Sequence, residues 1–280
     1  MTLKKILAGA LSLMMVVGVF TMTSCGNKED ATAEGGASSQ TANEGELIVG
    51  LDDAFAPMGF RDKNNELIGF DIDLANEVGK ELGMKVTFKP ISWDAKDMEL
   101  KSKNIDCIWN GMSVTPERKE KYSLSKKYLD NTIILMKEKA DKKTSVKEAK
   151  DLADLKIGTQ AASSALEMLK KNEAYDSFKD NITEYPDYDK ALLDLKAGRI
   201  DVLAIDQVLG EYKNKNLKGE LEVCDYSLGT DAYAIGFRKD DTALRDAVND
   251  AIKKVIDSGK AEEISNNWFG KNIVIFEDVK

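Results

Sequence analysis

Strand-like and helix-like segments alternate along most of this chain, and that alternation constrains its fold more than any other feature. Short apolar runs typical of buried strands, such as 47–51, are separated by stretches with apolar residues at helical spacing. The clearest helices are predicted over 70–82, ending at Gly83, and over 243–257, closed by Gly259. This pattern predicts an α/β fold with a mainly parallel sheet and helices on both of its faces.

One short segment occurs twice. Residues 100–106 (Leu-Lys-Ser-Lys-Asn-Ile-Asp) resemble residues 195–201 (Leu-Lys-Ala-Gly-Arg-Ile-Asp), and each is predicted to be a helix end, a tight turn and a strand start. Six residues after the shared Ile, the first copy reaches Gly111 and the second reaches Asp206. Because ligands bind at the carboxyl ends of strands in open α/β sheets, the repeat predicts two similar lobes with these residues on opposite walls of a cleft. Chance similarity of two helix–turn–strand units is the alternative.

The nine residues 110–118 (Asn-Gly-Met-Ser-Val-Thr-Pro-Glu-Arg) indicate a helix start that holds an anion. Thr115 suits the N-cap, and Pro116 suits the first helical position. Arg118 then lies in the first turn, beside backbone N–H groups without helical partners, where its guanidinium could hold a carboxylate bidentately. A structural Arg118 paired with a nearby acid is the alternative, and the spacing alone does not decide between them.

Composition excludes several classes of function. The chain has 280 residues, no histidine and a formal net charge of −9. Without histidine there is no His-based catalytic triad and no His ligand for a metal, and we expect neither a metal nor another cofactor. The acidic balance argues against nucleic acid as a partner. Cys107 and Cys224 lie in apolar strand-like runs, which favours buried thiols over a disulfide between them.

The N-terminal part is predicted to direct and anchor the protein. Two lysines precede an uncharged apolar run over 6–20, as in a secretory signal peptide, and the run is short for a membrane span. The segment 23–26 (Thr-Ser-Cys-Gly) resembles a bacterial lipobox, which predicts a signal peptide over 1–24 and lipidation of Cys25 at the outer face of the cytoplasmic membrane. A plain signal peptide or a single membrane anchor is the alternative. Residues 25–45 lack large apolar side chains and are predicted to be a flexible tether.

From residue 46 to residue 270 the chain resembles the amino-acid-binding proteins of ABC importers, which form extracellular solute-binding protein family 3. The matching segments are 49–60, 68–74, 110–118, 155–160, 198–201, 233–237 and 268–270. The resemblance implies a two-lobed, periplasmic-binding-protein-like fold of type II, with two crossover strands between the lobes. Lobe one would comprise 46–130 and 232–280, and lobe two would comprise 131–231.

The resemblance also implies how the two charged ends of an amino acid would be held. The residues that it assigns to the α-carboxylate are Arg118, Ser113, Ser164 and the adjacent Ser163. Asp206 and a backbone carbonyl near Gly111 would hold the α-ammonium, although Asp206 also suits a helix N-cap. Ala162 stands where the family usually has Gly. The assignment meets a physical requirement, because a buried zwitterion is tolerated only when both of its charges are paired.

Other residues would surround the side chain of the bound amino acid. Phe55 and Trp93 match aromatic residues that flank it in the family, although each would otherwise be read as a core residue. Asp52, Asn110 and Gln160 match residues that contact the ligand side chain, and Asn110 favours a polar one. Asp52 does not decide the ligand, because binders of basic amino acids and of glutamine both have an acid there.

The resemblance therefore implies capture and delivery without catalysis. The open form would bind a free amino acid, close about the crossover strands, and dock on an ABC transporter permease that works with its ATPase. We expect a monomer. One alternative is a dehydratase-like enzyme that acts on small carboxylates, which would need a general acid that the matched positions do not supply. The other is an amino-acid sensor module that feeds a membrane receptor.

Overall fold

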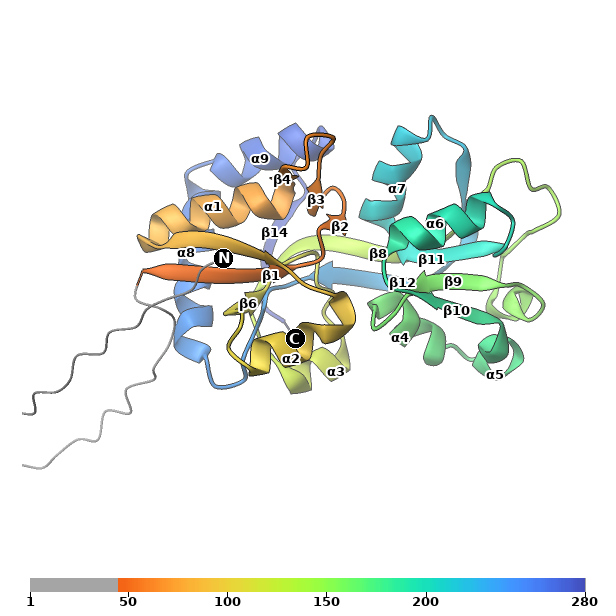
Figure 1. Cartoon of the computed structure of the whole chain (residues 1–280), viewed down its shortest axis with the longest axis horizontal. Helices are drawn as coiled ribbons and strands as arrows, with labels where there is room; N and C mark the ends of the chain where they lie inside the picture. The colour runs from red at the N-terminus through yellow and green to blue at the C-terminus, as the bar shows by residue number, and fades with distance from the viewer. Residues whose placement is uncertain (1–44, 280) are drawn as a thin grey trace, which may run out of the picture. The chain divides into compact units, whose positions relative to one another are not determined.

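The structure is a computed structural model, and it describes residues 45–279 (Figure 1). The predicted signal peptide, the predicted lipidation site Cys25 and the predicted tether up to residue 44 lie outside the described residues. Within 45–279, no helix is both long enough and apolar enough to cross a membrane. The first strand of the folded part begins at Glu46.

The first of two large sheets has the strand order β5-β1-β6-β13-β7. The strand β1 (Glu46–Leu51) pairs in parallel with β5 (Lys85–Pro90) and with β6 (Cys107–Ile108). The strand β13 (Gly236–Phe237) pairs antiparallel with β6 and with β7 (Ser123–Leu124). The C-terminal part of the chain thus returns to complete a sheet that the N-terminal part begins.

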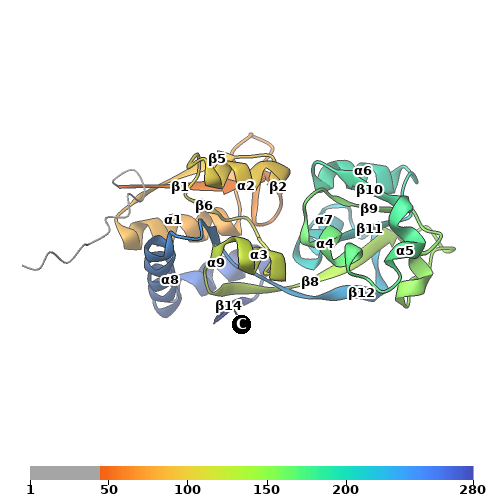
Figure 2. The same cartoon turned by 90° about the horizontal axis from the view of Figure 1, so that it is seen from below.

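Three helices that contact one another lie beside this sheet, namely α1 (Phe70–Leu82), α8 (Thr242–Asp257) and α9 (Lys260–Phe269) (Figure 2). Their apolar residues recur at helical spacing, so one face of each helix is buried, as at Leu74 and Val248. The other elements of this part are η1 (Trp93–Ala95), α2 (Lys96–Lys101), α3 (Pro116–Lys121) and a small sheet of β2 (Ala54–Phe55), β3 (Gly59–Arg61) and β4 (Leu67–Ile68).

The second large sheet has the strand order β10-β9-β11-β8-β12. The strand β9 (Ile157–Gln160) pairs in parallel with β10 (Ile182–Tyr185) and β11 (Val202–Asp206), whereas β8 (Lys127–Glu138) pairs antiparallel with β11 and with β12 (Leu221–Tyr233). The remaining elements around this sheet are η2 (Ala149–Leu152), α4 (Ser164–Lys170), α5 (Tyr175–Phe178), η3 (Lys179–Asn181), α6 (Tyr188–Lys196) and α7 (Gln207–Asn216). The C-terminal strand β14 (Val274–Glu277) pairs with the first part of β8, at Leu129 and Lys127, and contacts α9 on the side of the first sheet (Figure 2). We use the names lobe one and lobe two for the parts that hold the first and second sheets.

Two long strands, β8 and β12, run side by side between the lobes (Figure 2). Their antiparallel pairing extends from Glu138 opposite Leu221 to Leu129 opposite Tyr233. We call them the crossover strands. Side chains on their central part can reach both lobes.

The prediction of a mainly parallel sheet is wrong, because both large sheets are mixed. Parallel pairing is limited to β1 with β5 and β6, and to β9 with β10 and β11. The reason is the connection between the lobes. One crossover strand carries the chain into lobe two and the other carries it back, so the two run antiparallel, and β8 is also antiparallel to β11. Local sequence periodicity indicates where strands are, but it carries no information on whether two strands pair in parallel or antiparallel.

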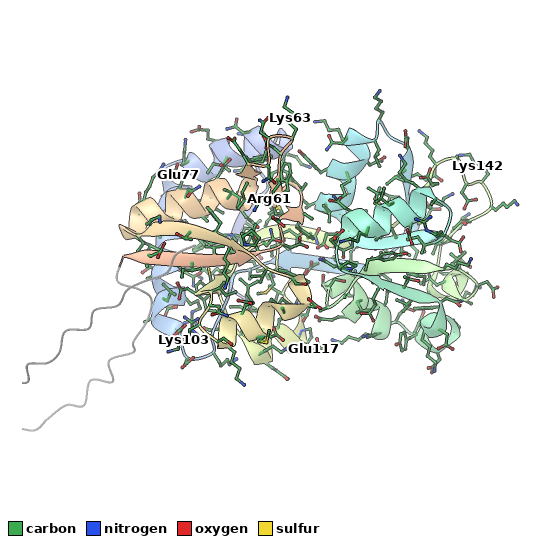
Figure 3. The ribbon with its side chains drawn as sticks, in the orientation of Figure 1. Arg61, Lys63, Glu77, Lys103, Glu117 and Lys142 are labelled. Carbon is green, nitrogen blue, oxygen red and sulfur yellow. The ribbon has the colours of Figure 1, made fainter. Side chains whose placement is uncertain are left out.

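The predicted structural similarity of residues 100–106 and 195–201 is confirmed at the tight turn within each segment. Lys103 and Gly198 occupy matching positions, and both adopt the left-handed conformation, with φ of 59° and 66°. After each turn, an aspartate carboxylate accepts a backbone N–H from the neighbouring chain segment, from Ile48 to Asp106 at 2.9 Å and from Lys156 to the matching Asp201 at 2.8 Å. Lys103 is exposed at the surface of lobe one (Figure 3).

The two turns give a matched test of this backbone conformation. Gly198→Ala should lower the free energy of unfolding by about 1 kcal/mol, because a side chain in the left-handed conformation is strained. The space beside Gly198 is open, so the added methyl group meets no atom. Lys103→Gly should leave stability unchanged or raise it. Urea unfolding of the three ligand-free proteins measures both effects, and a Gly198→Ala protein as stable as the wild type would contradict this reading of the turn.

Candidate functional site

Most of the residues predicted from the sequence to bind a ligand line one small cavity where the two lobes meet. The nine lining residues are Phe55, Trp93, Gly111, Ser113, Arg118, Gln160, Ser163, Ser164 and Asp206. The cavity volume is about 10 Å³. The other two predicted residues adjoin it, because Asp52 accepts a hydrogen bond from Gln160 Nε2 at 2.7 Å and Asn110 accepts one from the Asp52 N–H at 3.0 Å. The structure therefore brings all eleven together.

Arg118 is held by the helix start that the sequence predicts. Thr115 is the N-cap of α3 and accepts the backbone N–H of Arg118 at 3.3 Å, and Pro116 begins the helix. The residue Arg118 is buried, at 4% exposed. One guanidinium nitrogen donates to the carbonyl of Ser113 at 3.1 Å. The alternative, a structural arginine paired with an acid, holds in part, because a carboxylate oxygen of Glu167 lies 3.4 Å from a guanidinium nitrogen of Arg118. However, the buried Nε of Arg118 has no partner among the described residues.

The start of helix α4 supplies the predicted serines from lobe two. Ser163 is the N-cap, and its hydroxyl accepts the backbone N–H of Leu166 at 3.1 Å. Ser164 is buried and shares a hydrogen bond of 2.8 Å with Ser113, which lies in lobe one. Ala162, which precedes the two serines, adopts the left-handed conformation with φ of 54°. Its carbonyl oxygen thereby accepts a hydrogen bond from Arg118 at 3.3 Å.

Asp206 lines the same cavity as Arg118 and stands at the carboxyl end of β11, in lobe two. It occupies the N-cap position of α7, but its side chain makes no capping hydrogen bond. Its carboxylate instead accepts hydrogen bonds from Asn131 at 2.8 Å and from Tyr233 at 2.9 Å. Burial, and then the nearby Asp231, raise the pKa of Asp206 to about 7. An unpaired carboxylate is therefore costly at this position.

A polar group of side chains forms another wall. Asp52 and Gln160 stand at the carboxyl ends of β1 and β9, and their hydrogen bond joins the two lobes. Burial raises the pKa of Asp52, and its hydrogen bonds with the Ala54 N–H and with Gln160 oppose this effect. The amide nitrogen of Asn110 is buried and has no hydrogen-bond partner within the described part of the chain. These groups can bind polar atoms of a ligand.

Four further residues contact the site and were not predicted from the sequence: Lys96, Asn131, Tyr188 and Asp231. Lys96 is 5% exposed and donates to the carbonyl of Ala162 at 3.2 Å, and burial followed by the charge of Arg118 lowers its pKa to about 8. The ring of Tyr188 lies 6.0 Å from that of Phe55. The sequence contained one signal that could have indicated two of these residues, because Asn131 and Asp231 are polar residues within the crossover strands.

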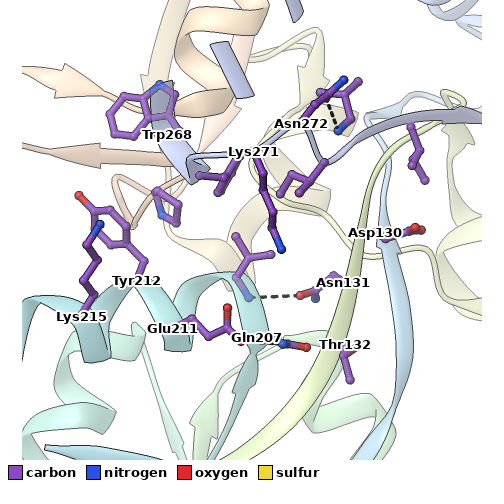
Figure 4. A pocket seen from close by; sticks show the side chains of 16 residues that line it. Asp130, Asn131, Thr132, Gln207, Glu211, Tyr212, Lys215, Trp268, Lys271 and Asn272 are labelled. Carbon is purple, nitrogen blue, oxygen red and sulfur yellow. Dashed lines mark hydrogen bonds between the residues drawn. The ribbon is translucent and has the colours of Figure 1, made fainter. Parts of the chain in front are cut away.

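A larger cavity, of about 550 Å³, lies beside the crossover strand β8 (Figure 4). Helix α7 forms one wall with Glu211 and Lys215, and the C-terminal segment forms the other with Lys271. None of the residues predicted to bind the ligand lines it. Charges of both signs are mixed here, so this cavity does not define one class of ligand. It shares Asn131 with the smaller site, because this residue also contacts Asp206.

The described residues contain no group of three or more acidic, histidine or cysteine side chains that could hold a metal ion. Cys107 and Cys224 are both free thiols, so the structure contains no disulfide between them. Cys107 is buried, as predicted, and burial raises the pKa of its thiol. Cys224 is only partly buried.

Comparison with known proteins identifies the family. Residues 47–271 match the model of the bacterial extracellular solute-binding proteins, family 3. This match spans most of the chain, and the chain therefore belongs to that family. Its members act outside the cytoplasm and bind solutes.

Two curated relatives illustrate the likeness in sequence. The L-cystine-binding protein TcyJ of Escherichia coli (strain K12) is 30% identical over 268 residues, which cover 95% of this chain and 97% of TcyJ. The arginine-binding extracellular protein ArtP of Bacillus subtilis (strain 168) is 28% identical over 264 residues, which cover 92% of this chain and 96% of ArtP. Both relatives are solute-binding proteins.

Solved structures show the same fold. An ABC uptake transporter substrate-binding protein from Streptococcus pneumoniae with bound histidine is 36% identical, with a TM-score of 0.73 over 82% of this chain and 95% of that one. An ancestral arginine-binding protein bound to arginine is 32% identical, with a TM-score of 0.74 over 81% of this chain and 99% of that one. The predicted two-lobed fold of type II is confirmed by these likenesses.

A buried acid behind the site gives a prediction for pH. Asp71 accepts hydrogen bonds from the Gly111 N–H at 2.8 Å and from Tyr128 at 3.1 Å, and burial raises its pKa to about 7. A raised pKa favours folding at low pH, and this contribution is lost as the pH rises toward and past 7. The wild type should therefore lose about 2 kcal/mol of its free energy of unfolding between pH 5 and pH 8 that Asp71→Asn does not lose.

Urea unfolding of both ligand-free proteins at the two pH values measures this difference. Asp225→Asn, which changes an exposed acid, is the control and should lose stability as the wild type does. A stability difference between Asp71→Asn and the wild type that stays the same at both pH values would show that Asp71 is ionised throughout.

Proposed function

We propose that this protein captures a free amino acid outside the cytoplasm and delivers it to the permease of an ABC importer, which works with its ATPase. The observation that carries the proposal is the buried Arg118 of lobe one facing the same small cavity as the buried Asp206 of lobe two. A zwitterion needs one cation and one anion as partners, and Arg118 and Asp206 supply them from different lobes. Cystine, arginine and histidine, named for its relatives, are all amino acids.

The two charged ends of the amino acid have distinct partners. Arg118, whose Nε has no partner among the described residues, binds the α-carboxylate. The hydroxyls of Ser113 and Ser164, now hydrogen bonded to each other at 2.8 Å, turn to the same carboxylate. Ser163 keeps its capping bond and places the helix start beside the ligand. Asp206, with the backbone carbonyl of Gly111, binds the α-ammonium.

The ligand side chain extends toward the polar wall. Asp52 and Gln160 are already hydrogen bonded to each other, and the amide nitrogen of Asn110 is free among the described residues. A buried donor without a partner is costly, which favours a ligand side chain that carries an acceptor there. Phe55 and Trp93 pack on the apolar part of that side chain. We therefore propose a polar amino acid.

Capture requires movement of the lobes. The cavity of about 10 Å³ has room for roughly one water molecule, so an amino acid can enter only when the lobes separate. Several contacts join the lobes in the present closed arrangement, among them the hydrogen bonds from Lys96 and Arg118 to the carbonyl of Ala162. A ligand that binds both walls takes the place of some of these contacts and stabilises a closed form, which the permease then receives.

The remaining parts of the proposal concern the setting in the cell. A lipid on Cys25 keeps the protein at the outer face of the cytoplasmic membrane, and the following tether lets it reach the permease. The protein acts as a monomer and does not transform its ligand. Its relatives support the last point, because they are solute-binding proteins and not enzymes.

Isothermal titration calorimetry tests the proposal. The protein without its signal peptide, carrying Cys25→Ser and freed of bound amino acid, is titrated with the twenty amino acids, ornithine and cystine. One polar amino acid should bind tightly with one site per chain. Arg118→Ala and Asp206→Ala should each weaken it by at least about 30-fold, because each change leaves a buried charge unpaired.

The control for these variants is Arg199→Ala, which removes an exposed arginine of lobe two and should leave binding unchanged. A folded protein that binds none of the amino acids would refute the proposed function.

A further inference from the structure

Asp231 is a half-buried residue, and its carboxylate has no part in the proposed binding of the amino acid. It lies on the crossover strand β12, directly opposite Asn131 on β8. One carboxylate oxygen accepts hydrogen bonds from Ser113 at 2.5 Å and from Asn131 at 3.0 Å. The other oxygen, Oδ1, is buried and has no partner among residues 45–279. The Asp231 side chain therefore has acceptor capacity left at the edge of the site.

Asn131 holds this carboxylate beside that of Asp206. A single amide nitrogen donates to both, at 2.8 Å to Asp206 and at 3.0 Å to Asp231. The amide is fixed from its other end, because its oxygen lies 3.5 Å from the backbone N–H of Val208 at the start of α7 (Figure 4). The two carboxylates are thus close neighbours that come from different elements, β11 and β12.

Two carboxylates this close need a cation or a proton. The charged and titratable groups around them are Arg118, which acts on both, together with Tyr233 and Tyr188 beside Asp206. Both tyrosines stay neutral near pH 7, because burial raises their pKa values. Arg118 is the cation of the α-carboxylate site, so the pair has no cation of its own among these groups. Burial raises the pKa of Asp231, and burial with Asp231 raises that of Asp206 to about 7.

We propose that Asp231 is a second ammonium-binding residue, so that the α-ammonium lies between Asp206 and Asp231 and displaces to solvent a proton that the pair shares without ligand. This inference rests on the proposed function. An ammonium group has three N–H donors, which match the two carboxylates and the carbonyl near Gly111. Because Asp231 belongs to a crossover strand, the amino acid then contacts lobe one, lobe two and the strand about which they close.

The proposal fixes how affinity depends on pH. The bound ammonium favours the ionised pair, so it lowers a pKa that is near 7 without ligand. Affinity should level off between about pH 7.5 and pH 8.5, above which the free amino acid loses its α-ammonium proton, and it should fall as the pH drops below 7, by up to tenfold per pH unit. At pH 6.5 binding should release a large fraction of one proton, and at pH 8.5 it should release almost none.

The experiment is calorimetry at pH 6.5 and 8.5 in two buffers of different ionisation enthalpy, which gives the number of protons released. The probes are L-arginine, L-histidine, L-glutamine and L-cystine, and the tightest binder is used throughout. The wild type is compared with Asp231→Asn, which keeps the shape of the side chain. Asp225→Asn, an exposed acid on the same strand, is the matched control.

Asp231→Asn should bind at least tenfold more weakly at pH 8.5 and should release clearly fewer protons than the wild type at pH 6.5, because burial alone still raises the pKa of Asp206. Asp225→Asn should match the wild type. Any proton that the probe itself releases is common to all variants and cancels in the comparison. If Asp231→Asn does not fold, Asp231→Ser replaces it. Wild-type binding without proton release would overturn the proposal with no variant at all.

Wild-type affinity and proton release in Asp231→Asn would also overturn it, and would leave Asp231 as a support for Ser113 and Asn131 only. Both of these results presuppose that an amino acid binds. Failure of every amino acid in the full panel would instead refute the proposed function, so the two failures are distinguishable.

Discussion

Burying an ionised side chain costs several kcal/mol unless a partner compensates its charge, and this constraint governs the site where the two lobes meet. Arg118 and Asp206 are both buried there, and each has hydrogen bonds that hold it without neutralising it fully. Protein carbonyls and hydroxyls supply most of the present contacts. An amino acid supplies the missing charges in one molecule, and it does so only when both lobes contact it. Ligand binding and lobe closure are consequently one event with a common electrostatic cause.

The repeated helix–turn–strand unit explains why matching positions meet at this site. Gly111 and Asp206 follow the two copies of the repeat, and both line the cavity. Asp52 and Gln160 stand at the carboxyl ends of the matching strands β1 and β9, and they form a direct hydrogen bond of 2.7 Å. Each lobe thus presents the carboxyl ends of its parallel strands to the other, as ligand sites of α/β sheets generally require. The crossover strands add a third group of contacts through Asn131 and Asp231.

Local signals in the sequence predicted much of this fold and most of the lining of the site. Helix α1 has the predicted bounds and ends at Gly83 in the left-handed conformation, because its apolar spacing and its stop signal are both local. The Thr115 cap and Pro116 likewise placed Arg118. The direction of the crossover strands and the role of Asn131 depend on segments distant in sequence. Asn131 and Asp231 are 100 residues apart, so no spacing rule could join them.

The central claim is that one amino acid lies between a cation of lobe one and an anion of lobe two. A crystal structure of the protein with its bound amino acid tests it most directly. The account predicts the α-carboxylate on the guanidinium of Arg118 and the α-ammonium within hydrogen-bond distance of Asp206. An amino acid bound in the larger cavity beside β8, or in this site with neither Arg118 nor Asp206 in contact, would contradict it.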